Sequence, residues 1–218
     1  MVINVGRYSD LPAKITMAML ASHRQTALKL AKRRGTVRWR DFAEKGVTPS
    51  TIARLVEEGA LAKLGRGLYQ AVGVEFSEHQ SLLEAAAAAP NGIIALLSAL
   101  RLHGLTTQNP QAVWMLIDGK ARAPLSPPVR IKVLRASGAA LTAGVETRKI
   151  DGTLLKVTTA PKTVADCFKY RRHIGLDVAI EALRDGLRRR TFTPDAFLAM
   201  ARVDRMETFA RPYLEALV

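Results

Sequence analysis

Apolar residues in the first third of the chain recur at helical spacing in three segments, residues 22–34, 40–45 and 48–59. Two short strand-like runs, residues 60–64 and 68–72, follow and are separated by a glycine-containing turn. A short helix, a tight turn, a second helix and a basic hairpin, in that order, are typical of a winged helix-turn-helix. We therefore expect such a domain over residues 22–75, preceded by an N-terminal extension over residues 1–21.

The third helical segment has the clearest boundary signals. Thr48 is a favourable N-cap residue, and Pro49 suits the first position of a helix. Ile52, Leu55 and Val56 then form an apolar stripe at intervals of three and four residues. We expect this stripe to be buried, which leaves the polar side chains of the same helix facing solvent.

The remaining residues, 76–218, alternate between helical and strand-like patterns. Helices are predicted over residues 78–89 and 93–103, and strands over residues 112–118, 129–134, 145–150 and 154–159. From Pro161 the pattern is helical to the end, with Pro161, Pro194 and Pro212 each near a predicted helix start. The predicted fold class is α+β: an N-terminal winged helix-turn-helix followed by a mixed α/β C-terminal domain that ends in a helical segment.

The net charge of the chain indicates what kind of partner it binds. The chain of 218 residues has 33 Lys and Arg against 19 Asp and Glu, a formal net charge of +14. Half of this excess lies in residues 1–75, which hold 13 basic and 6 acidic residues and are about half as long as the remainder. A folded domain with such a basic density favours a polyanionic partner, and double-stranded DNA is the partner that fits a winged helix-turn-helix.

The N-terminal half of the 48–59 helix is the predicted base-reading element. In a helix-turn-helix the second helix enters the major groove, and its first residues face the base edges. The candidates that lie off the apolar stripe are Thr48, Ser50, Thr51 and Arg54. Hydroxyl groups bond several kinds of base edge, whereas arginine bonds guanine in bidentate fashion. Thr48 has a competing structural role as the cap.

Basic residues beside this helix are predicted to contact the DNA backbone. Arg38, Trp39 and Arg40 precede the 40–45 helix, and Trp39 is equally suited to the core. Lys63 and Arg66 lie in the hairpin, where they would reach sugar-phosphate groups or the minor groove. The alternative is that Gly65-Arg66-Gly67 forms only a tight turn with a solvated charge.

Signals for catalysis are weak. The sequence has no phosphate-binding loop motif, no zinc-protease motif, no paired cysteines and no nucleophile-elbow motif, and its four histidines lack metal-ligand spacing. Lys162 and Asp166 suggest a charged cluster, but their spacing of four residues is explained by an ion pair within one helix. We expect no enzyme activity, no metal and no cofactor, and we interpret Cys167 as a small buried apolar residue.

The composition indicates a soluble cytoplasmic protein with no membrane partner. The single cysteine, Cys167, favours a reducing compartment. The first residues show no basic segment followed by an apolar one, so no signal peptide is expected. The most apolar segment, residues 82–105, is interrupted by Glu84, Asn91 and Arg101 and is therefore not a membrane span.

Several motifs resemble the AbiEi-type antitoxins of type IV toxin–antitoxin and abortive-infection systems. They are Gly67–Tyr69, Ile94–Gln108, Val113–Trp114, Pro161–Arg171, Ile174–Ala179 and Arg211–Leu217. The resemblance covers the chain after Ala21, and the extension over residues 1–21 has no clear counterpart.

The resemblance implies two activities. One is an N-terminal winged helix that represses its own operon by binding promoter repeats. The other is a C-terminal antitoxin domain over residues 76–218 that opposes, directly or indirectly, a nucleotidyltransferase-like toxin encoded alongside. Two alternatives stay open at this point: a stand-alone regulator whose C-terminal domain senses a ligand or dimerises, and an enzyme acting on nucleic acid through Lys162 and Asp166.

Overall fold

The computed structural model describes residues 13–73, 78–125 and 127–217 of the chain. These residues form two compact units, with the boundary after residue 77. The first helix begins at Ala13, well before the predicted start at residue 22, so part of the predicted N-terminal extension is helical. Residues 1–12 of that extension lie outside the described residues.

The first unit is a winged helix-turn-helix. Its elements in chain order are α1 (Ala13–Arg34), β1 (Thr36–Arg38), α2 (Trp39–Ala43), α3 (Pro49–Glu57), β2 (Leu61–Gly65) and β3 (Leu68–Ala71). The three strands form an antiparallel sheet in the order β1-β3-β2, with β2 and β3 as the predicted hairpin. Strand β1 is the one element of this unit that the sequence pattern did not predict, because three residues are too few to show alternation.

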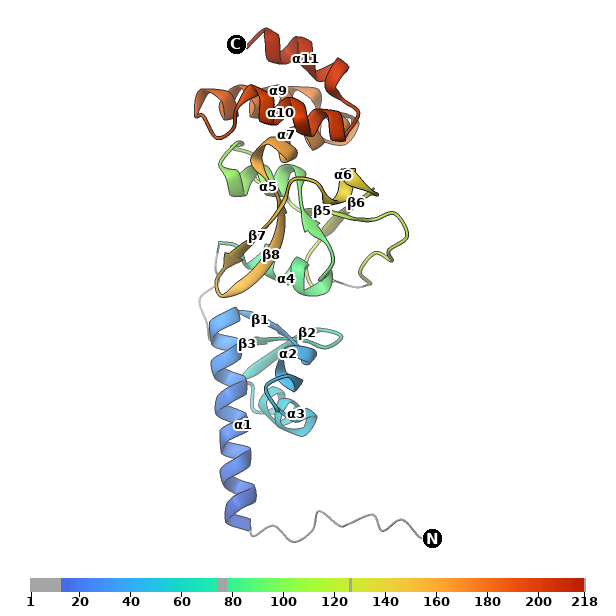
Figure 1. Ribbon diagram of the computed structural model, residues 1–218. Coiled ribbons are helices and arrows are strands. Elements are labelled where there is room, and N and C mark those ends of the chain that lie inside the picture. The colour runs from blue at the N-terminus through green and yellow to red at the C-terminus, as the bar shows by residue number, and fades with distance from the viewer. Residues whose placement is uncertain (1–12, 74–77, 126, 218) are drawn as a thin grey trace, which may run out of the picture. The chain divides into compact units, whose positions relative to one another are not determined.

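The helices of the first unit enclose a small apolar core. Its buried members are Ala27, Leu30, Ala31, Val37, Phe42, Val47, Ile52, Leu55, Leu61 and Ala71. Residues from α1, α2, α3 and all three strands thus meet in one cluster, and Figure 1 shows α1 running alongside the shorter helices and the sheet. The core fixes the orientation of α3, whose exposed face carries Ser50 and Arg54.

The second unit is a five-stranded mixed sheet with helices, as the predicted fold class states. Its elements are α4 (Gln80–Ala88), β4 (Ile93–Ile94), α5 (Leu96–His103), β5 (Val113–Asp118), β6 (Ile131–Ala136), α6 (Ala139–Thr142), β7 (Val145–Ile150), β8 (Thr153–Thr158), α7 (Ala160–Lys169), α8 (Arg171–Ile174), α9 (Leu176–Arg188), α10 (Pro194–Val203) and α11 (Glu207–Glu215). The strand order is β6-β5-β4-β8-β7. Strands β5 and β6 are parallel, as are β4 and β8, whereas β4 pairs antiparallel with β5 and β7 with β8.

Two apolar clusters cover opposite faces of this sheet. Trp114 and Leu116 join a large core with α5, α7, α9, α10 and α11, whereas Val113 and Met115 join a smaller core with α4. Because successive side chains of a strand point to opposite faces, β5 must be apolar along almost its whole length. Figure 1 shows α7 within the group of C-terminal helices that form the larger core.

Two details of the predicted helices are wrong. Ile93 and Ile94, expected at the start of a helix, form the central strand β4, where these β-branched residues pair with β5 and β8. Pro212 lies inside α11 and not at its start, because that helix already begins at Glu207. Periodicity alone does not distinguish a very short buried strand from the first turn of a helix.

Candidate nucleic-acid interface

Helix α3 has the predicted orientation. Thr48 caps it, with its Oγ1 accepting a hydrogen bond from the backbone N–H of Thr51 at 3.4 Å. Ile52 and Leu55 are buried, and Val56 is partly buried against the same core. Ser50 and Arg54 are exposed, so two of the predicted base-reading side chains lie on the solvent face of the helix.

Thr51 corrects the prediction. This residue was expected off the buried stripe, but only 6% of its surface is exposed. Its hydroxyl oxygen lies 2.9 Å from Thr48 Oγ1, so the two side chains hold the first turn of α3 together. Thr51 precedes Ile52 directly and therefore shares the core-facing edge of the helix. It positions α3 and is not available to a base edge.

The hairpin turn is tied to the start of α2. The backbone N–H of Trp39 donates a hydrogen bond of 2.8 Å to the carbonyl of Gly67, and Arg38 pairs with Leu68 in the β1–β3 ladder. Gly67 has a φ of +67°, a conformation that favours glycine at the turn. Arg66 is exposed in that turn. The fold thus brings Arg66 to the same end of the sheet as Arg38 and Trp39, which precede it by more than 25 residues in the sequence.

Of the two roles expected for Trp39, the structure shows the one in the core. Its side chain is partly buried and packs against the core of the first unit. Its neighbour Arg40 is exposed, and Arg38 is half-buried with its backbone N–H donating to Asp41 Oδ2 at 3.1 Å. Trp39 therefore serves chiefly to anchor the start of α2, while Arg40 presents its charge to solvent.

Four of the predicted cations, Arg40, Arg54, Lys63 and Arg66, are exposed and form no ion pair with any described residue. Other charges of this unit behave differently, because Arg24 pairs with Glu58 at 2.8 Å and Arg34 pairs with Asp41 at 3.3 Å. Lys45, in the turn between α2 and α3, is a further exposed cation, which the motif pattern does not predict as a contact. Unpaired exposed cations are free to neutralise phosphate groups at little desolvation cost.

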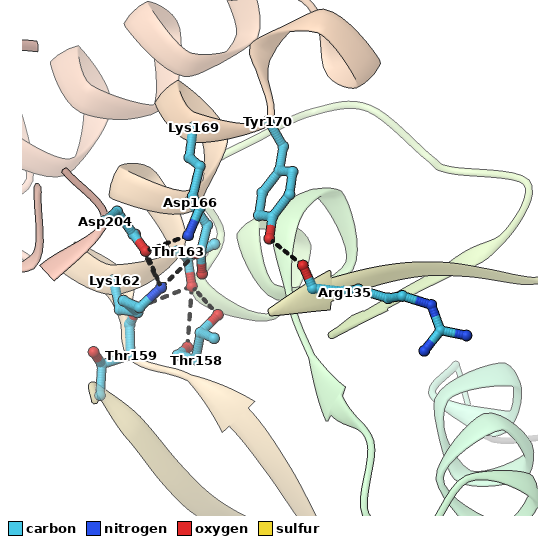
Figure 2. A network of polar contacts seen from close by, with 9 residues as sticks. All are labelled: Arg135, Thr158, Thr159, Lys162, Thr163, Asp166, Lys169, Tyr170 and Asp204. Carbon is cyan, nitrogen blue, oxygen red and sulfur yellow. Dashed lines mark hydrogen bonds and ion pairs between the residues drawn. The ribbon is translucent and has the colours of Figure 1, made fainter. Parts of the chain in front are cut away.

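The second unit contains a cluster of charged residues that are buried and paired, unlike the exposed cations of the first unit (Figure 2). Lys162 is fully buried in α7, and its ammonium group donates to Asp166 Oδ1 and, at 2.9 Å, to Asp204 Oδ2. Asp204 Oδ1 also accepts from Lys169 at 3.3 Å. The expected pair within one helix is present, but no local pattern predicts the contact with Asp204, which lies 42 residues after Lys162.

Buried groups surround this cluster closely. Thr163 Oγ1 donates to the Thr158 carbonyl at 3.0 Å, which joins α7 to the end of β8. Gly144 lies over the lysine with a φ of +62°, and a Cβ there would approach Lys162 Cβ to 2.7 Å. Burial raises the pKa of Asp166 to about 7, although the charge of Lys162 opposes this shift. The Oδ2 atom of Asp166 is buried without a hydrogen-bond partner among the described residues.

The cluster is closed to solvent. Lys162, Asp166 and Asp204 are at most 4% exposed, and a substrate would have to displace packed side chains to reach them. Within the described part of the chain, no group of three or more His, Cys, Asp or Glu residues is arranged to hold a metal ion. Cys167 is fully buried, as expected for a small apolar residue.

A family comparison adds to the geometry of the first unit. Residues 25–72 match the family model described as a transcriptional regulator, AbiEi antitoxin. This segment is therefore similar to the DNA-regulator part of AbiEi antitoxins, and we refer to it as the AbiEi-type domain. The match spans α3 and the hairpin, so the resemblance to AbiEi antitoxins is confirmed for residues 25–72, which include the motif Gly67–Tyr69 and the exposed cations described above. The other five motifs lie outside the matched residues.

Comparison with solved structures concerns the fold of the whole chain. The crystal structure of the RV2827C protein from Mycobacterium tuberculosis is similar, with a TM-score of 0.57 and 14% sequence identity. The similarity covers 98% of this chain and 85% of that one, so the AbiEi-type domain and the second unit both have counterparts there. No curated protein matches the sequence. Among the described helices, none combines the length and apolarity required to cross a membrane.

Proposed function

We propose that this protein is a transcriptional autorepressor that binds double-stranded DNA through α3 and the β2–β3 hairpin. The observation that carries the proposal is the set of exposed, unpaired cations on an AbiEi-type winged helix. Arg54 and Ser50 are assigned to base edges, because they lie on the solvent face of α3. Arg40, Lys63 and Arg66 are assigned to phosphates, with Arg38 as a further candidate.

The proposed target is the promoter region of the protein's own operon. This part of the proposal is supported by the regulator description of the family model. Thr48, Thr51 and Trp39 act indirectly in this account, because they fix the start of α3 and the start of α2. Their substitution would weaken DNA binding by disturbing those helices.

The second unit is proposed to act as the antitoxin domain against a nucleotidyltransferase-like toxin encoded alongside. The family whose model matches the first unit is described as an antitoxin, and the second unit has a separate apolar core, which supports assigning it an activity of its own. The alternative of catalysis through Lys162 and Asp166 is not favoured, because both side chains are sealed in that core.

Two arginine variants test the DNA-binding assignment. Arg54→Ala is expected to reduce discrimination between promoter and scrambled DNA by roughly 1–3 kcal/mol, because it removes a base contact. Arg66→Ala is expected to weaken binding to both DNAs alike, because it removes a phosphate contact. Electrophoretic or anisotropy titrations measure both effects, with Arg172→Ala, an exposed arginine of the second unit, as the control. Equal losses on the two DNAs for both variants would show that α3 is wrongly placed.

The same variants separate the two proposed activities in cells. With the neighbouring toxin co-expressed, Arg66→Ala should relieve repression of a promoter reporter while growth remains protected. Loss of protection together with repression would place the antitoxin activity in DNA binding and would refute the division between the units.

A further inference from the structure

An open groove of about 580 Å³ lies at the C-terminal end of α9 in the second unit. Its floor is apolar and its edges are basic. The floor includes Leu187, Phe192 and Leu217, and the arginines are Arg184, Arg188 and Arg190. Neither the winged helix nor the buried lysine cluster uses any of these side chains.

The floor of the groove is a fixed part of the core. Phe192 is 8% exposed and packs 6.3 Å, between ring centroids, from the buried Phe197. It can lie against α9 because residue 186 of that helix is glycine, where any Cβ would collide with the Phe192 ring. Glycine is normally unfavourable inside a helix. At position 186 it is required, because any larger residue would collide with the Phe192 ring.

The backbone of Arg190 adopts a left-handed conformation, which is usually adopted by glycine. Its φ is +52°, and it follows the last turn of α9. Its N–H donates to the Leu187 carbonyl at 3.0 Å, and the next N–H, of Thr191, donates to the Gly186 carbonyl at 3.0 Å. This pattern is a Schellman cap, whose left-handed residue is usually glycine. An arginine here puts backbone strain into the end of the helix and places a cation at the groove.

The charges at the groove are largely uncompensated. Arg184 and Arg190 are exposed and form no ion pair with another described residue. Arg188 pairs with Asp185 at 3.0 Å, but its side chain is 72% exposed. A partner that fits must therefore supply negative charge at the edges. It must also supply an apolar group, because a phosphate backbone would leave the aromatic floor without a matching contact.

We propose that this groove binds an acidic segment of a partner protein. Carboxylates of that segment pair with Arg184 and Arg190, and one of its apolar side chains covers Phe192 and Leu187. The proposal holds for any partner of this chemistry and does not depend on the DNA-binding assignment.

Fluorescence anisotropy with the full-length protein and synthetic peptides tests the proposal. The probe is a labelled peptide with Glu and Leu at helical spacing, and its companion has Ser in place of each Leu. We expect the Glu/Leu peptide to bind about tenfold more tightly than the Glu/Ser peptide. The variant R184E/R190E should lose about tenfold in affinity, whereas R130E/R172E, with the same charge change at exposed arginines outside the groove, should not.

The variant Arg190→Gly removes a groove cation without destabilising the fold, so a loss of peptide affinity in it cannot be attributed to unfolding. Glycine fits the left-handed conformation, so this variant should unfold at the same or a higher temperature while losing up to about fivefold in peptide affinity. Failure of the Glu/Leu peptide to bind, or equal losses in R184E/R190E and R130E/R172E, would overturn the proposal. It would also be overturned if R184E/R190E weakened duplex DNA binding as strongly as peptide binding, because the groove would then be a nucleic-acid surface.

Discussion

The two units place the same sequence pattern in opposite environments. Arg40 and Glu44 in the first unit have the same spacing of four residues as Lys162 and Asp166 in the second. Arg40 and Glu44 are both exposed and form no ion pair with each other, whereas Lys162 and Asp166 are buried and bonded. Burial therefore decides the role of such a pair. An exposed cation is available to a partner, and a buried one holds helices together.

The largest effect is expected from removing the buried cation. Lys162→Met leaves Asp166 and Asp204 in the core without their common partner. Breaking a buried ion pair on one side costs about 3–5 kcal/mol, so the free energy of unfolding of the second unit should fall by that amount. Urea denaturation measures it, and Lys149→Met, at an exposed lysine of the same unit, should change stability by less than about 0.5 kcal/mol.

Asp166 gives the cluster a characteristic pH dependence. Its pKa is raised from 3.8 to about 7 in the folded chain, so between these values the folded protein keeps a proton that the unfolded chain releases. Stability from this group must therefore decline as the pH rises from about 4 to 7, by at most ~1.4 kcal/mol per pH unit.

The variant Asp166→Asn removes this titration. The difference in unfolding free energy between the native protein and the variant, measured by urea denaturation over this pH range, should decline as the pH rises. A difference that stays constant would mean that Asp166 does not keep its proton in the folded state.

Substitutions at two glycines test how tightly the buried Lys162 is packed, because only one of the two glycines contacts it. Gly144 and Gly138 have φ values of +62° and +56°, so alanine strains the backbone at both positions. Only at Gly144 does a Cβ meet Lys162 and Met200, whereas at Gly138 nothing lies within 4 Å. Gly144→Ala should therefore destabilise the protein by about 1–3 kcal/mol more than Gly138→Ala. Thermal unfolding of the two variants measures this, and equal losses would argue against tight packing over the lysine.

Local signals predicted most of the fold but not the long-range contacts. The capped α3, the hairpin and strand β5 follow from N-cap chemistry, turn residues and apolar spacing, all of which act within a few residues. The sequence pattern predicts a helical turn at β4, because only the neighbouring strands β5 and β8 define this segment as a strand.

The candidate interface shows the same limit. Ser50, Arg54, Lys63 and Arg66 are exposed, as the spacing predicts, whereas Thr51 is buried at the core-facing edge of α3 and contacts Thr48. The partnership of Lys162 with Asp204 depends on how α10 packs on α7. No local pattern encodes that packing.

The salt dependence of DNA binding tests the central claim most directly, namely that the exposed cations of the first unit neutralise phosphates. The logarithm of promoter affinity, plotted against the logarithm of salt concentration, should fall with a slope of about −0.9 for each phosphate neutralised. The double variant Arg40→Ala/Arg66→Ala of the full-length protein should therefore show a slope shallower by about 1.8. An unchanged slope, or a flat response in the native protein, would contradict the account.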